Sequence, residues 1–492
     1  MNGRLKSKST YEYIGGATWL DPALEYRRLF MADHYASPKP GGINLNKASI
    51  PKVIDEVLAG VKKNIKEWSE KGISDEQKEK IEREARHKAA KLLGSQNPAE
   101  IIFGRNTTET ISLSYWLAGQ YEKEHLAAEV LLSDSENPSV YRATHVNVDN
   151  GNRDQKDLLT TYSDLSDPSH STYKPPDEWI RHSSFNICIF GAYGNETLAE
   201  MKGQIEAVMS ECRKQPGLMI LSHVLRHNGR VMPVKKLVAH AKAVKKHHYP
   251  ENPELFVCID GAMALGNLPT CDTDELGCDL YAASPHKTLG SPTLGVGRMN
   301  LSSPLVREHL PIMQELQPVD QLLFKRMFDP ELNISSNVDE EIDPAALLGF
   351  NKTIDYLEDH SIKEGDDFSK TANRRLRIKN YAKKQLASLR ESGIPITFTP
   401  SQNGSSFILS FNLFGWPEFE PAYLPGYVNP IIFDGDSKEK NVAQMLDKRG
   451  IALSFIRRGK IFRISFHWTT TKKEIDEFVR VLREILTNPQ SL

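Results

Sequence analysis

Residues 255–297 read LFVCIDGAMALGNLPTCDTDELGCDLYAASPHKTLGSPTLGVG, and the rest of the chain can be interpreted from this segment. Its apolar beginning, Leu255 to Ile259, has the length and the β-branched content of a buried strand that ends at Asp260. A second short strand is predicted over Leu280 to Ala283, and Ser-Pro-His-Lys follows it directly at 284–287. The pattern therefore delivers a carboxylate and a lysine from the ends of two neighbouring strands.

A carboxylate and a lysine in this arrangement suit pyridoxal 5'-phosphate. The aldehyde of this cofactor forms a Schiff base with a lysine amine, and an aspartate against the pyridine nitrogen keeps the ring protonated so that it accepts electrons. Lys287 and Asp260 match these two roles. In the alternative interpretation, Asp260 caps a turn and Lys287 is a solvated surface lysine. A phosphate-binding P-loop is set aside because His286 replaces the glycine before the lysine and no helix pattern follows directly.

The order Asp-Gly-Ala at 260–262 and Ser-x-His-Lys at 284–287 resembles the class-V aminotransferase group of fold-type I pyridoxal phosphate enzymes. That group includes cysteine desulfurases and isopenicillin N epimerase, and the resemblance spans roughly residues 43 to 486. It implies an α/β fold with a large domain, whose mostly parallel sheet is flanked by helices, and a small α+β C-terminal domain. It also implies a homodimer whose sites are completed across the subunit interface.

The length and the pattern of the chain agree with several domains. Its 492 residues exceed the size that one hydrophobic core usually serves. Strand and helix patterns alternate through the middle of the chain, which favours a parallel sheet covered by helices on both faces. We predict an N-terminal arm over 1–42, a large cofactor-binding domain over 43–340 and a small domain over 341–492. Residues 146–184, rich in Asp, Asn, Ser, Thr and Pro, are interpreted as an insertion over the site.

Composition excludes some functions. There are 62 Lys and Arg against 64 Asp and Glu, so charge gives no general case for a nucleic-acid or membrane partner. No apolar run approaches a membrane span, and the basic N-terminus lacks the apolar core of a secretory signal. The five cysteines form no CxxC pair, which is typical of a reducing compartment. We therefore expect a soluble cytoplasmic protein with a small-molecule substrate. His240, His247 and His248 are interpreted as a solvated helix face, so no metal site is predicted.

A second motif predicts a phosphate site. Glu100 to Gly104 has the pattern of a strand, and Arg-Asn-Thr-Thr-Glu at 105–109 opens a helix of roughly fourteen residues. If Asn106 caps this helix, the free N–H groups near Thr107 and Thr108 point outward with the positive end of the helix dipole and can bind an anion. The alternative is an ordinary capping box without a ligand.

The resemblance assigns the rest of the cofactor site. It implies that Thr107 and Thr108 contact the phosphate and that Ser284 and His286 complete the cup. It also implies that His223, in a turn after a predicted strand at 218–222, lies beneath the ring. The alternative for His223 is a histidine whose hydrogen bonds are satisfied at the end of that strand.

Two positions depart from the family pattern. Where relatives commonly stack an aromatic residue or a histidine on the ring, this chain has Asn137, whose amide cannot stack in the same way. Asn137 is expected to make a polar contact, and either Tyr141 or His145 stacks on the ring instead or the ring is held more loosely. Three positions after Asp260, where relatives have histidine or glutamine near the ring oxygen, the chain has Met263, whose thioether cannot donate a hydrogen bond.

The substrate side is predicted from the C-terminal part and from a short N-terminal segment. By the resemblance, Arg463 holds the α-carboxylate of an amino acid substrate, because a guanidinium matches a carboxylate with two hydrogen bonds. Arg457 and Arg458 are rivals for this role, and a strand-surface arginine in an ion pair is the alternative. Asn46 lies in a segment similar to one that lines the substrate side in many relatives. Antiparallel strands are expected at 407–411 and 451–455, and a loop is expected around Gly290, Gly295 and Gly297.

The predicted chemistry begins when an amino acid displaces Lys287 from the cofactor. Loss of the α-proton to Lys287 then gives a carbanion that the ring stabilises. From there the paths to racemisation, transamination and β-elimination diverge. A cysteine desulfurase is disfavoured, because it needs a nucleophilic cysteine in the C-terminal part and no cysteine follows Cys278.

We predict a lyase (β-elimination, C–S lyase) or an epimerase of specialised metabolism, because the overall pattern is nearest the isopenicillin N epimerase branch. An aminotransferase is the first alternative. A catalytically silent binding protein on the same scaffold is a second, motivated by Asn137 and Met263, and a nucleotide-binding module is a third.

Overall fold

The computed structural model describes most of the chain. The described residues are 42–45, 55–104, 106–123, 129–133, 140, 186–190, 196–212, 215–268, 271–289, 291, 294–309, 343–363, 368–399, 406–413, 438–456, 461–467 and 470–487. The predicted insertion at 146–184 and nearly all of the predicted arm therefore lie outside them.

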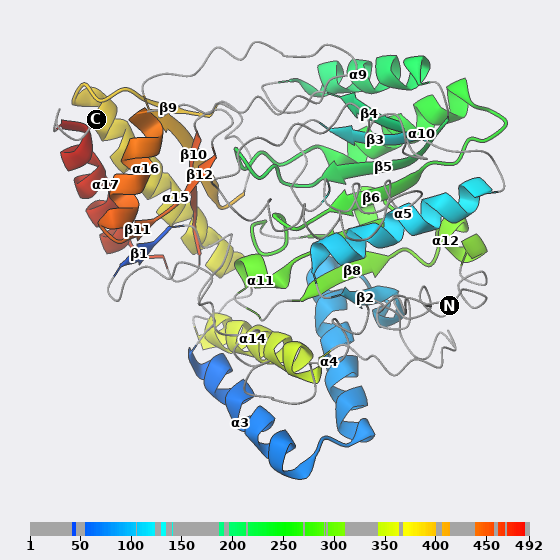
Figure 1. Ribbon diagram of the computed structural model, residues 1–492, viewed down its shortest axis with the longest axis horizontal. Helices are drawn as coiled ribbons and strands as arrows, with labels where there is room; N and C mark the ends of the chain where they lie inside the picture. The colour runs from blue at the N-terminus through cyan, green and yellow to red at the C-terminus, as the bar shows by residue number, and fades with distance from the viewer. Residues whose placement is uncertain are drawn as a thin grey trace, which may run out of the picture.

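A large sheet, seven-stranded in the described residues, forms the centre of the molecule (Figure 1). Its order is β2 (Ile101–Gly104), β8 (Gly295–Met299), β7 (Leu280–Ala283), β6 (Phe256–Asp260), β5 (Pro216–Ser222), β3 (Glu129–Ser133) and β4 (Asn186–Phe190). Neighbours from β7 to β4 run parallel, whereas β8 is antiparallel to both β7 and β2. The predicted mostly parallel sheet is confirmed.

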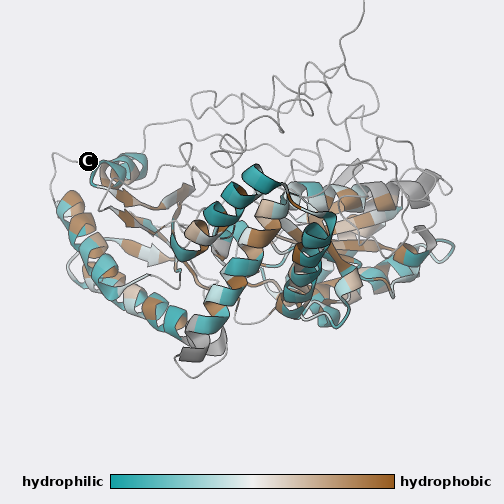
Figure 2. Cartoon of the chain, turned by 90° about the horizontal axis from the view of Figure 1, so that it is seen from below, coloured by the Kyte–Doolittle hydropathy of each residue, from teal (hydrophilic) through white to brown (hydrophobic). Residues whose placement is uncertain are grey.

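Alternation along the strands explains why helices cover both faces of this sheet. In β6, Val257 and Ile259 pack in one apolar core, and Phe256 and Cys258 pack in another. The first core is shared with α4 (Asp75–Leu93), α9 (Leu198–Glu211), α10 (Val234–His248) and α14 (Pro344–Lys363), and the second with α5 (Thr107–Lys123) and α12 (Pro304–His309). Since successive side chains of a strand point to opposite faces, a continuous apolar run predicts a sheet covered on both sides. Figure 2 shows teal, hydrophilic outer faces on helices around brown strands.

A smaller antiparallel sheet lies beside the large one. Its order is β12 (Ser454–Ile456), β13 (Ile461–Ser465), β10 (Ile408–Leu413) and β9 (Ile396–Phe398). It shares an apolar core with α15 (Phe368–Glu391), α16 (Lys438–Lys448) and α17 (Lys472–Thr487). The expected strand at 451–455 is wrong in detail, because β11 (Ile451–Ala452) leaves this sheet and pairs in parallel with β1 (Ile43–Asn44).

The N-terminal residues around β1 pack with the C-terminal part. The Ile43 amide donates to the Gly450 carbonyl at 2.8 Å, and the Leu45 amide donates to the Ala452 carbonyl at 2.7 Å. Leu45 is fully buried in the core of the small sheet. Conversely, α14 packs on α4 and on α3 (Asp55–Lys71). The domain bounds 43–340 and 341–492 stay a prediction.

Local sequence signals set several helix ends. Ser74 and Gln77 form a capping box at the start of α4, and Gly94 ends that helix with φ of 70°. Thr471 and Glu474 exchange the same pair of bonds at the start of α17, at 2.7 and 3.2 Å. No helix in the described ranges is long and apolar enough to span a membrane.

Two turns at the carboxyl ends of β5 and β6 connect the large sheet to the small one. Ser410 donates its hydroxyl to the His227 carbonyl at 2.9 Å, and the Ser406 hydroxyl donates to the Gly229 carbonyl. The Phe407 amide donates to the Asn267 carbonyl at 3.1 Å. The edge of the large sheet where parallel strands end therefore faces the small sheet.

Candidate functional site

Asp260 is the last residue of β6 and lies at the edge that faces the small sheet. Its side chain is fully buried, and its Oδ1 accepts a hydrogen bond from the Ala262 amide at 2.7 Å. Its neighbours across the sheet are Ser222 of β5 and Ala282 of β7. Ligands of open parallel sheets bind outside the carboxyl ends of the strands, which is where this carboxylate stands.

The segment after β7 carries the predicted lysine. Ser284 is buried and precedes the one-turn helix α11 (Pro285–Thr288), and the Lys287 amide donates to the Ser284 carbonyl at 3.2 Å. Lys287 and His286 are partly buried. Figure 1 shows α11 on the side of the large sheet that faces the small one. Because β6 and β7 are parallel neighbours, Asp260 and this segment leave the sheet at the same edge.

His286 is held as a neutral side chain beside the lysine. Its Nδ1 lies 3.3 Å from the Leu294 carbonyl oxygen. Burial lowers the pKa of His286 to about 4, and the charge of Lys287 acts in the same direction. An imidazole that stays neutral beside an ammonium keeps its hydrogen-bond donor without adding charge.

The N-terminus of α5 lies against the same segment. The Asn106 side chain caps the helix as predicted, with Oδ1 accepting from the Glu109 amide at 3.0 Å. The hydroxyls of Thr107 and Ser284 are hydrogen-bonded to each other, so two of the four residues of the predicted phosphate cup are in contact. Thr108, the next residue of α5, is partly buried.

Two glycines let α5 approach the sheet this closely. A Cβ at Gly295 would lie 2.5 Å from the Asn106 carbonyl oxygen, and a Cβ at Gly297 would lie 2.7 Å from side-chain atoms of Ile102 and Thr110. Both glycines are in β8, so the loop expected around them is wrong. Close packing of a helix start on the sheet explains why a strand carries glycine here.

His223 follows β5 immediately and is buried beside Asp260. Its amide donates to the Asp260 carbonyl at 2.9 Å, and its Nδ1 lies 3.1 Å from the Tyr281 hydroxyl oxygen. Burial lowers the pKa of His223 to about 4, so the ring is neutral at pH 7. Met263 packs in a small apolar cluster with Val224 of the adjacent turn and Ile408 of β10.

Arg463, the predicted substrate carboxylate ligand, is fully buried in β13. Its Nη1 donates to the carbonyl of Arg226, in the turn after β5, at 3.0 Å. Burial, together with the charge of Arg226, lowers the pKa of Arg463 to about 9. In this structure the guanidinium contacts the turn that borders the site, and its contact with a substrate stays a prediction.

One buried arginine was missed from the sequence. Arg375 of α15 is 6% exposed, stacks on the Phe407 ring with its guanidinium carbon 3.9 Å from the ring centre, and donates from Nε to the Phe466 carbonyl at 2.8 Å. It also donates to the Gly266 carbonyl in the turn after β6. The signal was its helical spacing, because Arg375, Ile378 and Ala382 form one buried stripe.

Other predicted residues fall outside the described part of the chain. These are Asn46, Asn137, Tyr141, His145, Arg457 and Arg458. Within the described part, no group of three or more His, Cys, Asp or Glu could hold a metal ion.

The described groups fit pyridoxal phosphate chemically. Helix N–H groups at the start of α5, with the Thr107 and Ser284 hydroxyls, suit a phosphate. The buried Asp260 carboxylate suits a protonated pyridine nitrogen, and the Lys287 amine suits an aldehyde. All of these groups leave the large sheet at one edge.

Comparison with known proteins agrees with this arrangement. The family model of class-V aminotransferases matches residues 196–478. A cysteine desulfurase of Yersinia pestis (strain Pestoides F) is 21% identical over 416 residues, which cover 81% of each chain. Among solved structures, the cystine C–S lyase C-DES bound to its product cysteine persulfide has a TM-score of 0.61 at 16% identity, covering 90% of this chain and 99% of its own. The cysteine desulfurase CsdA from Escherichia coli has a TM-score of 0.58 at 15% identity, covering 96% of this chain and 100% of its own.

These comparisons overturn the reaction predicted from the sequence. The preference for a lyase or an epimerase over a desulfurase is wrong, because the curated relatives are named cysteine desulfurases. The exclusion rested on the lack of a cysteine after Cys278. That lack removes one internal acceptor for sulfur, but it leaves the carboxylate, the lysine and the phosphate cup unchanged.

Proposed function

The chain belongs to the class-V aminotransferase family of pyridoxal phosphate-dependent enzymes, and we propose that it is a desulfurase that removes sulfur from cysteine. The names of its curated relatives support this substrate. The observation that carries the proposal is the meeting of Asp260, the Ser284–Lys287 segment and the start of α5 at one sheet edge.

The residues at this edge have separate proposed roles. When bound, pyridoxal phosphate supplies an electron sink that weakens the bonds at the α-carbon of an amino acid. The Asp260 carboxylate keeps the proton on the ring nitrogen, and the Lys287 amine binds the aldehyde and then moves a proton at the α-carbon. Thr107, Thr108 and Ser284 donate hydrogen bonds to the phosphate.

His286 is neutral and adds no charge to this site. His286 is proposed to border the cofactor. Its Nδ1 hydrogen goes to the Leu294 carbonyl, and its low pKa means that it adds no positive charge next to Lys287. A positively charged neighbour would disfavour the ammonium form of the lysine, and a neutral one does not. Asn137 is proposed as a further polar contact to the cofactor, and Asn46 as a contact to the substrate.

The proposed reaction converts cysteine and a thiol, RSH, into alanine and a persulfide, RSSH. The carbon–sulfur bond of cysteine breaks, a carbon–hydrogen bond replaces it, and the sulfur forms a new bond to the thiol sulfur. Atoms and electrons balance because the carbon is reduced as the transferred sulfur is oxidised. No further reductant is needed.

We propose that the thiol acceptor comes from solution, because the cysteines whose surroundings are described make poor nucleophiles. Burial raises the pKa values of Cys271 and Cys278 to about 12, and Cys258 is buried in the sheet. A thiol must lose its proton to attack sulfur. Cys212 is partly exposed, but it ends α9 just before β5 begins, so it lies at the opposite edge of the sheet from Asp260.

Three further proposals concern binding and assembly. Arg463 binds the substrate carboxylate, with Arg457 and Arg458 as alternatives, and this agrees with the planar fork of a guanidinium. The protein is a homodimer, as the family resemblance implies. It acts in the cytoplasm on a small amino acid, without a nucleic-acid or membrane partner, which its near-neutral charge favours.

The test is to incubate the purified protein with pyridoxal phosphate, L-cysteine and dithiothreitol and to measure alanine and sulfide. We expect one alanine per cysteine consumed, and a visible chromophore that Lys287→Ala abolishes together with the activity. Lys235→Ala is a matched control, because Lys235 is an exposed lysine paired with Glu275 on the protein surface.

Two outcomes would contradict the proposal at different levels. Formation of pyruvate and ammonia in place of alanine would show elimination and reject the desulfurase. A protein that stays colourless with added cofactor would reject the cofactor site itself.

A further inference from the structure

Tyr281 crosses beneath the strand that carries Asp260. It belongs to β7, is fully buried, and lies opposite Ile259 of β6 in the register. Its ring passes the position of Gly261, where a Cβ would overlap the ring carbon atoms and the hydroxyl oxygen. Because Gly261 has no side chain, the Tyr281 ring has room to extend from β7 to His223 at the end of β5.

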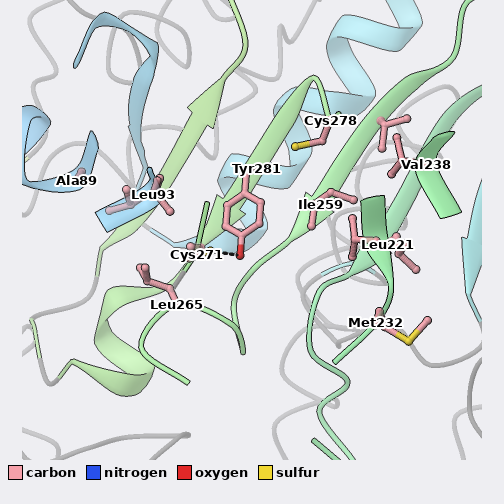
Figure 3. Packing of buried hydrophobic residues seen from close by; sticks show 14 of the residues in the cluster. Ala89, Leu93, Leu221, Met232, Val238, Ile259, Leu265, Cys271, Cys278 and Tyr281 are labelled. Carbon is pink, nitrogen blue, oxygen red and sulfur yellow. Dashed lines mark hydrogen bonds between the residues drawn. The ribbon is translucent and has the colours of Figure 1, made fainter. Parts of the chain in front are cut away.

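The Tyr281 hydroxyl contacts two other buried side chains. The Cys271 thiol donates to the hydroxyl oxygen at 2.9 Å, and the same oxygen lies 3.1 Å from His223 Nδ1. Figure 3 shows Cys271 beside the hydroxyl and Cys278 near the other end of the tyrosine side chain. Cys271 and His223 are each 8% exposed.

The direction of the thiol hydrogen bond decides where the other hydrogens of this group lie. Burial raises the pKa of the Cys271 thiol to about 12 and that of the Tyr281 phenol well above its usual value, so both keep their hydrogens. With the Cys271 thiol as the donor to the phenol oxygen, the phenol hydrogen is left for the other side, where Nδ1 lies. A neutral imidazole that accepts at Nδ1 carries its own hydrogen at Nε2.

We propose that Cys271 and Tyr281 are positioning residues that hold His223 as an Nε2–H donor towards the ring oxygen of the cofactor. This inference rests on the cofactor site of the proposed function, but not on the reaction. His223 lies next to Asp260, and its Nε2 has no hydrogen-bond partner in the described part of the chain, so it is available to a ligand. Met263 cannot supply that hydrogen bond, because its thioether has no donor.

The experiment is nitrogen-15 NMR of the full-length protein labelled at histidine, with and without added pyridoxal phosphate. The resonances of His223 are assigned by their loss in His223→Asn. In the wild type, we expect the hydrogen at Nε2 and an Nδ1 shift typical of a hydrogen-bonded acceptor. Addition of pyridoxal phosphate is expected to shift the Nε2–H signal and to slow its exchange with water.

Tyr281→Phe removes the hydroxyl and keeps the ring that packs against Gly261. We expect the Nδ1 signal to move towards that of a free acceptor, and the ratio of Nε2–H to Nδ1–H forms to fall about tenfold, the factor that one hydrogen bond contributes. Cys271→Ala should move the signal in the same direction, and Cys271→Ser should restore it. Cys278→Ala is the matched control, because it removes a buried thiol that makes no hydrogen bond to the Tyr281 hydroxyl.

A wild-type His223 with its hydrogen at Nδ1 would overturn the inference even if Tyr281→Phe did not fold. An unchanged Nδ1 signal in a folded Tyr281→Phe would overturn it as well. A His223 signal that ignores bound pyridoxal phosphate would reject the contact with the ring. The tautomer is read without cysteine, so failure of the desulfurase reaction would leave this test intact.

Discussion

At the scale of single residues, His223 couples the stability of the protein to pH. Burial lowers its pKa to about 4 in the folded chain, whereas the unfolded chain has an ordinary histidine with a pKa near 6.5. Between these values the unfolded chain binds a proton that the folded chain does not. The free energy of unfolding therefore falls as pH drops through this window, and this loss is absent above it.

We predict that the wild type loses about 2 kcal/mol of stability from His223 between pH 7 and pH 5, since each pH unit inside the window contributes about 1.4 kcal/mol. His286, whose pKa is also lowered to about 4, adds a loss of the same sign. Denaturant unfolding of the cofactor-free protein at both pH values measures the sum. His223→Gln should lose less on acidification, and the exposed His87→Gln should behave as the wild type. Equal losses in all three proteins would contradict the prediction.

Part of the site could be predicted residue by residue, and part could not. Asp260 and Lys287 could be proposed from the sequence because one ends a strand pattern and the other follows one closely, and the hydroxyls of Thr107 and Ser284 do meet. The contact from Cys271 through Tyr281 to His223 has no local pattern. It depends on which strands are neighbours and on a missing side chain at Gly261.

At the scale of elements, the start of α5 combines a helix cap with a proposed anion site. Asn106 satisfies one helix N–H, and the remaining N–H groups of the first turn point outward, as in any helix. Substitution at this one position can separate the two functions, because aspartate caps a helix as well as asparagine but carries a negative charge.

We predict that Asn106→Ala destabilises the protein by about 1 kcal/mol, the usual contribution of a cap. Asn106→Asp should keep the stability but weaken pyridoxal phosphate binding about tenfold or more, because its charge repels the phosphate. Unfolding curves and absorbance titration with the cofactor measure the two effects. An Asn106→Asp variant that binds as tightly as the wild type would place the phosphate elsewhere.

The elements themselves were predictable where the signal is local. The capping boxes at Ser74 and Thr471 can be recognised in the sequence, because their partners are three residues away. The strand at 451–455 was misplaced, because its division into β11 and β12 depends on pairing with Ile43–Asn44. The sequence near 451 contains no trace of that distant partner.

At the scale of the whole molecule, Arg375 connects the two sheets through hydrogen bonds. Its guanidinium donates to carbonyls on both sides, Gly266 at the large sheet and Phe466 beside the small one, and it stacks on Phe407. Burial lowers the pKa of Arg375 to about 9, which leaves it charged at pH 7. The turn after Asp260 is therefore held by a side chain of the small part.

We predict that Arg375→Met costs about 3 kcal/mol, because it leaves buried carbonyls without donors. Denaturant unfolding is monitored by the absorbance of the bound cofactor, and the variant should lose this absorbance at a lower denaturant concentration than the wild type. Arg374→Met is the control, since Arg374 is the exposed neighbour on the same helix. If both variants unfold at the same denaturant concentration, the contact between the two sheets does not depend on Arg375.

The pairing of β1 with β11 constrains how the chain can be made. Leu45 belongs to a core whose other members, apart from its neighbour Ile43, come from α15 and the elements after it, and its carbonyl accepts from the Ser465 amide at 2.8 Å. On the ribosome, the strands of the large sheet emerge long before β13 does. Since chains generally fold in the order of their synthesis, residues 42–45 wait until β13 has been made, and the small core closes after the large sheet.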